Sequence, residues 1–258
     1  MKSKNTLAKL TILIGLFNFA ITAAQAQVML TIENSNTTPY EPFMFATYSG
    51  SLAGINLSGD WLNNANLTNA DLTSAQLDDA DLSYVSLFGA TLANANLSRA
   101  TLTGAYLFGA NLNVTNLTSA LLDGAYLESA TLISAVLNGA NLTTADFNGA
   151  DLTSAHLTSA DLTKADLSYA ILSGANLFGA NFLGANLTGV TGLETTYFGG
   201  TAPTYDSNTI FTGTNFNPVT AGWTLTSASV PEPSTYAAIF GTVILGFAAI
   251  DRRRRKVA

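Results

Sequence analysis

The sequence predicts an all-β fold in which one long stretch of the chain winds into a coiled β-helix. A large apolar residue stands at every fifth position from Leu52 to Leu187, always Leu except for Phe147 and Phe182. Ala stands two residues before most of them. Only 10% of the residues are charged and none is Cys. This low charge content, together with the regular five-residue spacing, is typical of a repeat array rather than of a mixed globular core.

A period of five residues fits neither an α-helix nor one continuous strand. On an α-helix the leucines would drift by about 140° at each step and wrap around all sides. On a strand, successive leucines would alternate between the two faces. The pattern is satisfied if each unit is a short extended piece, with Ala and Leu on one side, followed by a turn. Turning in one sense then lines the inside of a coil with Ala and Leu, and the coils stack about 4.8 Å apart through backbone hydrogen bonds.

The repeated unit has the form Ala-(Asn/Asp)-Leu-X-X, as in residues 65–69 and 165–169. Residues 50–189 therefore resemble the pentapeptide-repeat family. The resemblance implies a right-handed quadrilateral β-helix with four units per coil. About seven coils are then expected, which make a rod roughly 34 Å long.

Five units depart from the pattern at the inward Ala position. These positions hold Gly50, Ile55, Asp60, Val85 and Thr115. Three of the five fall in the first coil, where a buried carboxylate would be costly. The first coil is therefore expected to be distorted, or to be capped by residues 27–49.

The first 26 residues have the pattern of a secretory signal peptide. A basic start is followed by an apolar stretch over residues 10–21 and by a small-x-small cleavage site that ends at Ala26. The mature chain is therefore expected to begin at Gln27. The alternative is an N-terminal membrane anchor. Asn18, which interrupts the apolar stretch, and the cleavage site both argue against an anchor.

The last 28 residues, 231–258, have three parts in order. Pro231, Glu232 and Pro233 come first, a mostly apolar stretch follows over residues 236–250, and a basic run occupies residues 252–256. Fifteen helical residues reach about 22 Å, which is a marginal transmembrane span. The basic run places the C-terminus in the cytoplasm and the body of the chain outside.

This tripartite tail resembles the PEP-CTERM sorting signal. The resemblance implies that an exosortase, a membrane-embedded processing enzyme, recognises the Pro-Glu-Pro motif. It also implies a Gram-negative bacterium that makes exopolysaccharide. The chain would be held in the membrane through its C-terminus before processing and would then lie at the cell surface or outside the cell. The alternative is an ordinary tail anchor.

Residues 190–230 break the period and are rich in aromatic side chains. The last coil of a solenoid exposes an apolar end that must be covered. This segment is therefore expected to act as a C-terminal cap and linker.

The charge distribution excludes nucleic acid as a partner. Between Gln27 and Val230 fifteen acidic residues face two basic ones, Arg99 and Lys164. An acidic body repels phosphate backbones and anionic headgroups. Some pentapeptide-repeat proteins mimic DNA and inhibit cytoplasmic topoisomerases, but the export signals argue against that role here.

No residues are predicted to be catalytic, to bind a cofactor or to bind a metal. His156 is the only histidine and occupies an outward position, where a solvated surface residue is expected. The densest acidic group, Asp78, Asp79 and Asp81, is interpreted as a solvated face with at most weak attraction for cations.

A second acidic set precedes the inward apolar residues of the later coils. It consists of Asp146, Asp151, Asp161 and Asp166. A calcium ladder is one interpretation, but hydrogen bonding of each side chain to the turn backbone is favoured because the acids are not grouped closely enough for calcium.

One outward feature is a candidate ligand or partner face. With four units per coil, residues twenty apart lie directly above one another. Phe88 would then stack with Phe108, and Tyr106 with Tyr126. Outward aromatic ladders can bind sugar rings or a protein partner, and they can equally be stabilising cross-coil pairs.

The sequence as a whole predicts a non-enzymatic, exported scaffold at the cell surface, associated with exopolysaccharide or with another surface protein. The alternative is a protein that binds carbohydrate or an ice surface through an outward face of the β-helix. Ice binding would require a flat, regular ladder of Thr, whereas the outward columns mix Asn, Ser, Thr, Asp and Leu.

Overall fold

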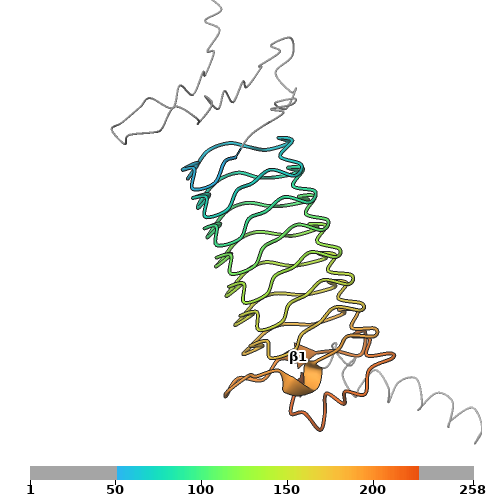
Figure 1. Ribbon diagram of the computed structural model, residues 1–258. Coiled ribbons are helices and arrows are strands. Elements are labelled where there is room, and N and C mark those ends of the chain that lie inside the picture. The colour runs from blue at the N-terminus through green and yellow to red at the C-terminus, as the bar shows by residue number, and fades with distance from the viewer. Residues whose placement is uncertain (1–50, 227–258) are drawn as a thin grey trace, which may run out of the picture.

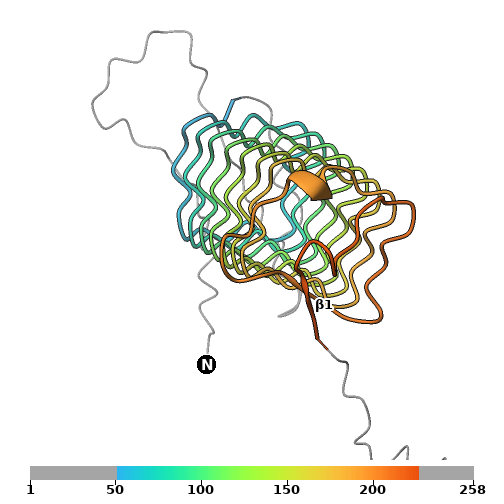
Figure 2. The same ribbon diagram turned by 90° about the horizontal axis from the view of Figure 1, so that it is seen from below.

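The computed structural model describes residues 51–226, which form a β-helix whose coils stack into a rod (Figure 1). Parallel β-bridges join each residue at the outward bridge position to the residue twenty further along, from Ser51 with Asp71 to Ile171 with Thr191. A coil of twenty residues holds four five-residue units and therefore four columns of bridges. Figure 2 shows the coils nested around a common centre.

The turn between units is the same throughout the regular part of the rod. The carbonyl oxygen of each inward Leu or Phe accepts the amide N–H three residues on, as Leu97 does from Ala100 at 3.0 Å. The third residue of every such turn has a positive φ, the conformation that a type II turn requires there. Because all turns bend the chain in the same way, the extended pieces close into a coil.

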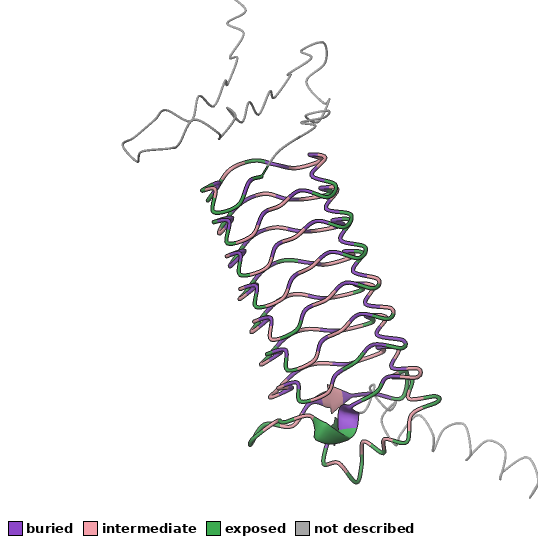
Figure 3. Cartoon of the chain, viewed as in Figure 1, coloured by how far each residue is buried: buried purple, intermediate pink, exposed green. Residues whose placement is uncertain are grey.

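The interior consists of the inward residues that the five-residue period predicts. Every Leu or Phe at the fifth positions is buried, and from Leu72 to Leu187 these side chains have no exposed surface. Buried and exposed positions alternate along each coil (Figure 3). Each buried Leu contributes about 1.5–3 kcal/mol before its lost conformational entropy is counted. The prediction of a β-helix lined by Ala and Leu is confirmed.

Two polar or larger residues that replace the inward Ala are accommodated in the core. Val85 and Thr115 are both fully buried. The Thr115 hydroxyl donates a hydrogen bond of 2.7 Å to the Leu92 carbonyl oxygen, so its burial leaves no unsatisfied donor.

The expected distortion of the first coil is wrong for the residues that the structure describes. Trp61 forms a regular bridge with Asp81, and the Asp81 amide donates to the Asp60 carbonyl oxygen at 2.9 Å. Asp60 and Ile55 are only half-buried. The cost of burying a carboxylate is therefore avoided, because Asp60 stands in the outermost described coil. Gly50 and residues 27–49 lie outside the described range.

The chain completes a further, irregular coil after the repeats end. The bridge spacing widens to 21 residues between Asn176 and Tyr197, and the next two bridges join Asn181 to Thr204 and Asn186 to Ile210. All four columns of bridges therefore continue beyond the five-residue period. The extra residues, among them the 3-10 helix η1 (Leu193–Thr195), lie between the bridges.

Two short strands extend this end of the rod. β1 (Thr204–Tyr205) pairs in parallel with β2 (Thr224–Leu225). Trp223, which precedes β2, is buried and stacks on Phe182 of the last regular coil, with ring centroids 4.9 Å apart.

Three further aromatic rings pack around Trp223, namely those of Tyr205, Phe211 and Phe216. This cluster covers the apolar interior at the C-terminal end of the described rod.

Several predicted features lie outside the described residues. They are the signal peptide at residues 1–26, its cleavage between Ala26 and Gln27, the sorting signal at residues 231–258 and the span at residues 236–250. Within residues 51–226, no helix has the length and apolarity needed to cross a membrane.

Candidate functional site

The outward Asn and Asp side chains are used to support the turns. At all fifteen units in which Asn or Asp precedes the inward Leu or Phe, its Oδ1 accepts the amide N–H of the residue two further on, as Asp166 does from Ser168 at 2.8 Å. Such side-chain turns are a common use of Asn and Asp. The four carboxylates considered as a calcium ladder are among these fifteen. In the described part of the chain, no three His, Cys, Asp or Glu residues are grouped as metal ligands would be.

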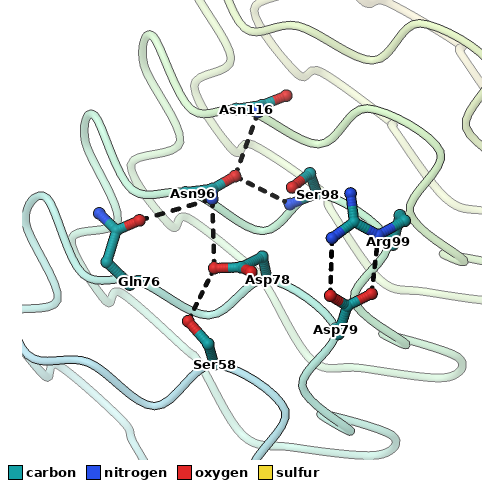
Figure 4. A network of polar contacts seen from close by, with 8 residues as sticks. All are labelled: Ser58, Gln76, Asp78, Asp79, Asn96, Ser98, Arg99 and Asn116. Carbon is teal, nitrogen blue, oxygen red and sulfur yellow. Dashed lines mark hydrogen bonds and ion pairs between the residues drawn. The ribbon is translucent and has the colours of Figure 1, made fainter.

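The acidic group near residue 80 is divided among separate partners (Figure 4). Asp78 Oδ1 accepts hydrogen bonds from Ser58 Oγ at 2.7 Å and from Asn96 Nδ2 at 3.2 Å. Asn96 Oδ1 accepts one from Asn116 Nδ2 at 3.1 Å. Asp81 supports its own turn. Asp78 and Asn96 thus link neighbouring coils along one side of the rod.

Asp79 forms an ion pair with Arg99, one coil further along (Figure 4). The guanidinium donates two hydrogen bonds to the carboxylate, at 2.8 and 2.6 Å. The hydrogen bond from Arg99 holds the pKa of Asp79 below its usual value, and the same bond raises the pKa of Arg99. These residues were not predicted to pair, although their separation of twenty is the signal that could have identified the pair.

His156 is exposed and lies in a column between Val136 and Asn176. Neither neighbour can act as an acid or a base. The position matches the solvated surface histidine expected from the sequence.

The two predicted aromatic pairs do stack. The ring centroids of Phe88 and Phe108 are 5.3 Å apart with an angle of 6° between the ring planes. Those of Tyr106 and Tyr126 are 5.2 Å apart with an angle of 2°. All four side chains are 44–49% exposed. The two columns lie side by side, since Tyr106 and Phe108 flank the buried Leu107.

A fifth aromatic residue, Tyr84, lies next to these columns. It occupies a turn position with φ 56° and is exposed. Its ring lies over Gly104 of the next coil, two residues before Tyr106. Tyr84 was not among the predicted residues of this face. The signal that could have identified it was again a separation of twenty, here from a glycine. We call Tyr84, Phe88, Tyr106, Phe108 and Tyr126 the aromatic strip.

Carboxylates border one end of the aromatic strip. Asp146 follows Tyr126 in the same bridge column. Glu128 follows Phe108 one coil further on, with its carbonyl oxygen bonded to the Gly109 amide. The strip is thus an apolar, aromatic surface with an acidic edge.

Comparison with known proteins identifies the repeat. The family model described as pentapeptide repeats, in eight copies, matches residues 51–87, 86–124, 110–149, 120–158 and 155–191, which together make up more than half of the chain. A search of curated proteins finds no match.

Among solved structures, the chain is similar to HetL, a pentapeptide repeat protein involved in heterocyst differentiation regulation from the cyanobacterium Nostoc sp. strain PCC 7120. The two share 29% identity over 63% of this chain and 81% of HetL, with a TM-score of 0.25. A pentapeptide repeat protein from the thylakoid lumen of Arabidopsis thaliana is 28% identical over 43% of this chain and 70% of its own length, with a TM-score of 0.28. Full-length QnrB1, a plasmid-mediated fluoroquinolone resistance protein, is 16% identical over 76% of this chain and 100% of its own, with a TM-score of 0.22.

Proposed function

Because the chain belongs to the pentapeptide-repeat family, we propose that it is a non-enzymatic scaffold that is exported and displayed at the cell surface. The observation that carries this proposal is the use of the outward polar groups. All fifteen Asn and Asp side chains that precede an inward residue serve a turn, and the single histidine has no acidic or basic neighbour in its column. The surface chemistry of the rod thus supports its architecture.

We assign the rod the form of a right-handed quadrilateral β-helix, with one five-residue unit on each side. The four-sided form is supported by the four bridge columns and by the left-handed residue in every turn, which together place four equivalent bends in each coil. A stiff rod of this kind suits a spacer or a surface for attachment, because every coil is held by backbone hydrogen bonds to the next.

Export rests on the two ends of the sequence. We propose that residues 1–26 are removed as a signal peptide and that residues 231–258 are a PEP-CTERM signal read by an exosortase. The apolar stretch 236–250 would hold the chain in the membrane until processing. The acidic body, whose partner would be exopolysaccharide or another surface protein, would then lie outside a Gram-negative cell.

Protein chemistry on the exported chain tests this proposal. N-terminal sequencing is expected to begin at Gln27, and mass spectrometry is expected to show loss of residues 252–256 with processing near Pro231-Glu232-Pro233. Glu232→Ala should retain the tail, whereas the matched change Glu194→Ala, in the exposed η1, should be processed normally. An intact Met1 would contradict export by cleavage. An intact tail in cells with an active exosortase would instead identify a plain membrane anchor.

The aromatic strip favours carbohydrate binding as a second function. Ice binding has less support, because the bridge columns alternate in chemistry: Asp71, Thr91, Asn111, Thr131 and Asp151 follow one another in a single column. An ice-recrystallisation assay with the exported chain is expected to show no inhibition.

A further inference from the structure

We propose that the C-terminal end of the rod lies against the lipid surface while the chain is anchored in the membrane. The contact is made by residues 207–226, which we call the end face. The proposal rests on the function proposed above, because it takes residues 236–250 as the membrane anchor. It adds the surface through which the folded body meets the bilayer, and hence an upright orientation of the rod.

The end face exposes an apolar residue that occupies an interior position. Tyr205 follows the bridge residue of its coil and thereby lies above Phe182. β2 continues this inward column, because Leu225 pairs in register with Tyr205, and in-register residues point to the same side. Phe182 and Tyr205 are buried, whereas Leu225 is 59% exposed. The inward column of the described rod therefore ends in an uncovered leucine.

The segment that leads into β2 adds further apolar side chains to the end face. The Trp223 amide donates to the Pro218 carbonyl oxygen at 2.9 Å, which holds this segment against the end of the rod. Val219, in the turn between them, is 71% exposed, and Phe211 and Phe216 are half-buried beside Trp223. Figure 1 shows the last described residues, in orange and red, gathered at one end of the rod. Apolar side chains exposed together in this way are typical of an interaction surface.

The end face is an uncharged part of an acidic rod. No residue from 207 to 231 is charged, whereas residues 51–206 contain thirteen carboxylates and only two cationic side chains. The sides of the rod would be repelled by anionic headgroups. The end face can approach a bilayer without that cost, and its apolar side chains gain free energy when they enter the boundary between headgroups and acyl chains.

The length of chain beyond the rod determines which surface the end face can reach. Only residues 227–235 separate Thr226 from the start of the anchor at Tyr236. A fully extended chain spans about 3.3–3.6 Å per residue, so the end face stays within roughly 35 Å of the bilayer. This short tether gives the end face a high effective concentration at the lipid surface, so even a weak apolar contact is occupied.

The test uses the chain with its C-terminal anchor intact, inserted in lipid nanodiscs. Because the sequence has no Cys, one fluorescent label can be attached through Val219→Cys on the end face or Val114→Cys on the side of the rod. Both valines are exposed, and Val114 lies four coils before η1, a separation of about 19 Å. Lipids with a spin-labelled headgroup quench a fluorophore only at short range. Because of that separation, quenching should be at least about threefold stronger at position 219 than at position 114.

The same substitution at two exposed leucines separates docking from mere tethering. Leu225→Glu places a charge on the end face and removes an apolar contact. Both changes oppose entry into the interface, so the quenching at position 219 should fall at least about twofold. The matched control is Leu121→Glu, at an exposed bridge position on the side of the rod, which should leave the quenching unchanged. Thermal melts check folding, and Leu225→Asn replaces Leu225→Glu if the latter melts early.

Three outcomes would overturn the proposal. The first is equal quenching at the two labelled positions. The second is quenching that Leu225→Glu lowers no more than Leu121→Glu does, as expected of a rod that only hangs on its tether. The third is self-association in sedimentation that Leu225→Glu abolishes, which would assign the end face to a second copy of the chain.

Failure of this inference can be told apart from failure of the proposed anchor. Co-migration of the chain with the nanodisc reports insertion without any label. A chain that inserts but is not quenched at position 219 contradicts docking alone. A chain that does not insert contradicts the anchor, and docking with it.

Discussion

The Tyr84 ring lies over Gly104, one coil further along the rod. Its Cε1 atom is 2.5 Å from the position that a Cβ on residue 104 would occupy, so the ring and any side chain there exclude each other. The same relation recurs at Tyr169 and Gly189, where the corresponding distance to Cε1 is 2.8 Å. In these columns a large turn residue on one coil is matched by glycine on the next.

Gly104→Ala is expected to destabilise the rod more than Gly109→Ala. Both glycines have φ near 62°, so alanine brings a similar backbone cost of about 1 kcal/mol at each. Only at residue 104 must the Tyr84 ring also move. Chemical denaturation should therefore give a larger loss for Gly104→Ala, and the extra loss should disappear when Tyr84→Ala is added. Equal losses in the two single variants would contradict the contact.

The interior of the rod could be predicted residue by residue because its period is local. A five-residue spacing of Leu allows only one side of each unit to face inward, so Leu112 and Leu132 could be placed in the core without knowing the length of a coil. Contacts between coils are different. The pair Asp79 and Arg99 and the overlap of Tyr84 with Gly104 depend on a step of twenty residues, which the five-residue period alone does not determine.

The irregular last coil could not be predicted for a related reason. Between Asn176 and Ile210 the bridges continue, but extra residues between them remove the period on which the prediction depends. The aromatic residues of this segment indicated a cover for the rod end, yet nothing in their spacing indicated that the segment first completes another coil.

Val114→Gly is expected to stabilise the protein by about 0.5–1 kcal/mol. Val114 is exposed, and its φ of 59° is a true outlier for a β-branched residue. Glycine relieves this strain of roughly 1–2 kcal/mol but gains conformational entropy in the unfolded chain, which offsets part of the benefit. The control is Val136→Gly, at a bridge position, which should destabilise by a similar amount in urea denaturation. Loss of stability in both variants would show that the Val114 turn is not strained.

Asp206→Ala is expected to loosen the C-terminal end of the rod. The buried Asp206 carboxylate accepts hydrogen bonds from the amides of Gly184 and Asn208 and from the Thr209 hydroxyl. Burial by itself would raise the pKa of Asp206, but these hydrogen bonds outweigh it and hold the pKa below its usual value. Hydrogen bonds to a charged group contribute about 1.5–3 kcal/mol, so a loss of that order is expected at pH 7.

The pH dependence of this effect follows from the lowered pKa. A carboxylate whose pKa falls on folding stabilises the native state at pH values above its pKa in the unfolded chain, which is roughly 3.9. That stabilisation is lost as the pH falls through the pKa of the folded state. The difference in unfolding free energy between the wild type and Asp206→Ala should therefore narrow below about pH 4. A difference that stays constant down to pH 2 would contradict the ionised, hydrogen-bonded carboxylate.

Leu112→Asp and Asn113→Asp test the inward arrangement itself, because they add the same charge at adjacent positions. Leu112 has no exposed surface, and its neighbours in the core are Ala and Leu, so an aspartate there would be buried without a partner. Such burial costs several kcal/mol and should unfold the adjoining coils. Asn113 points outward, and its Oδ1 accepts the Ile133 amide at 2.8 Å, a bond that a carboxylate can keep. Asn113→Asp should therefore shift stability by no more than about 0.5 kcal/mol.

Since the charge and the location are nearly the same, electrostatic repulsion from the acidic body cannot separate the two variants. Coinciding thermal melts would mean that Leu112 does not face the core, and the β-helix lined by Leu would be wrong.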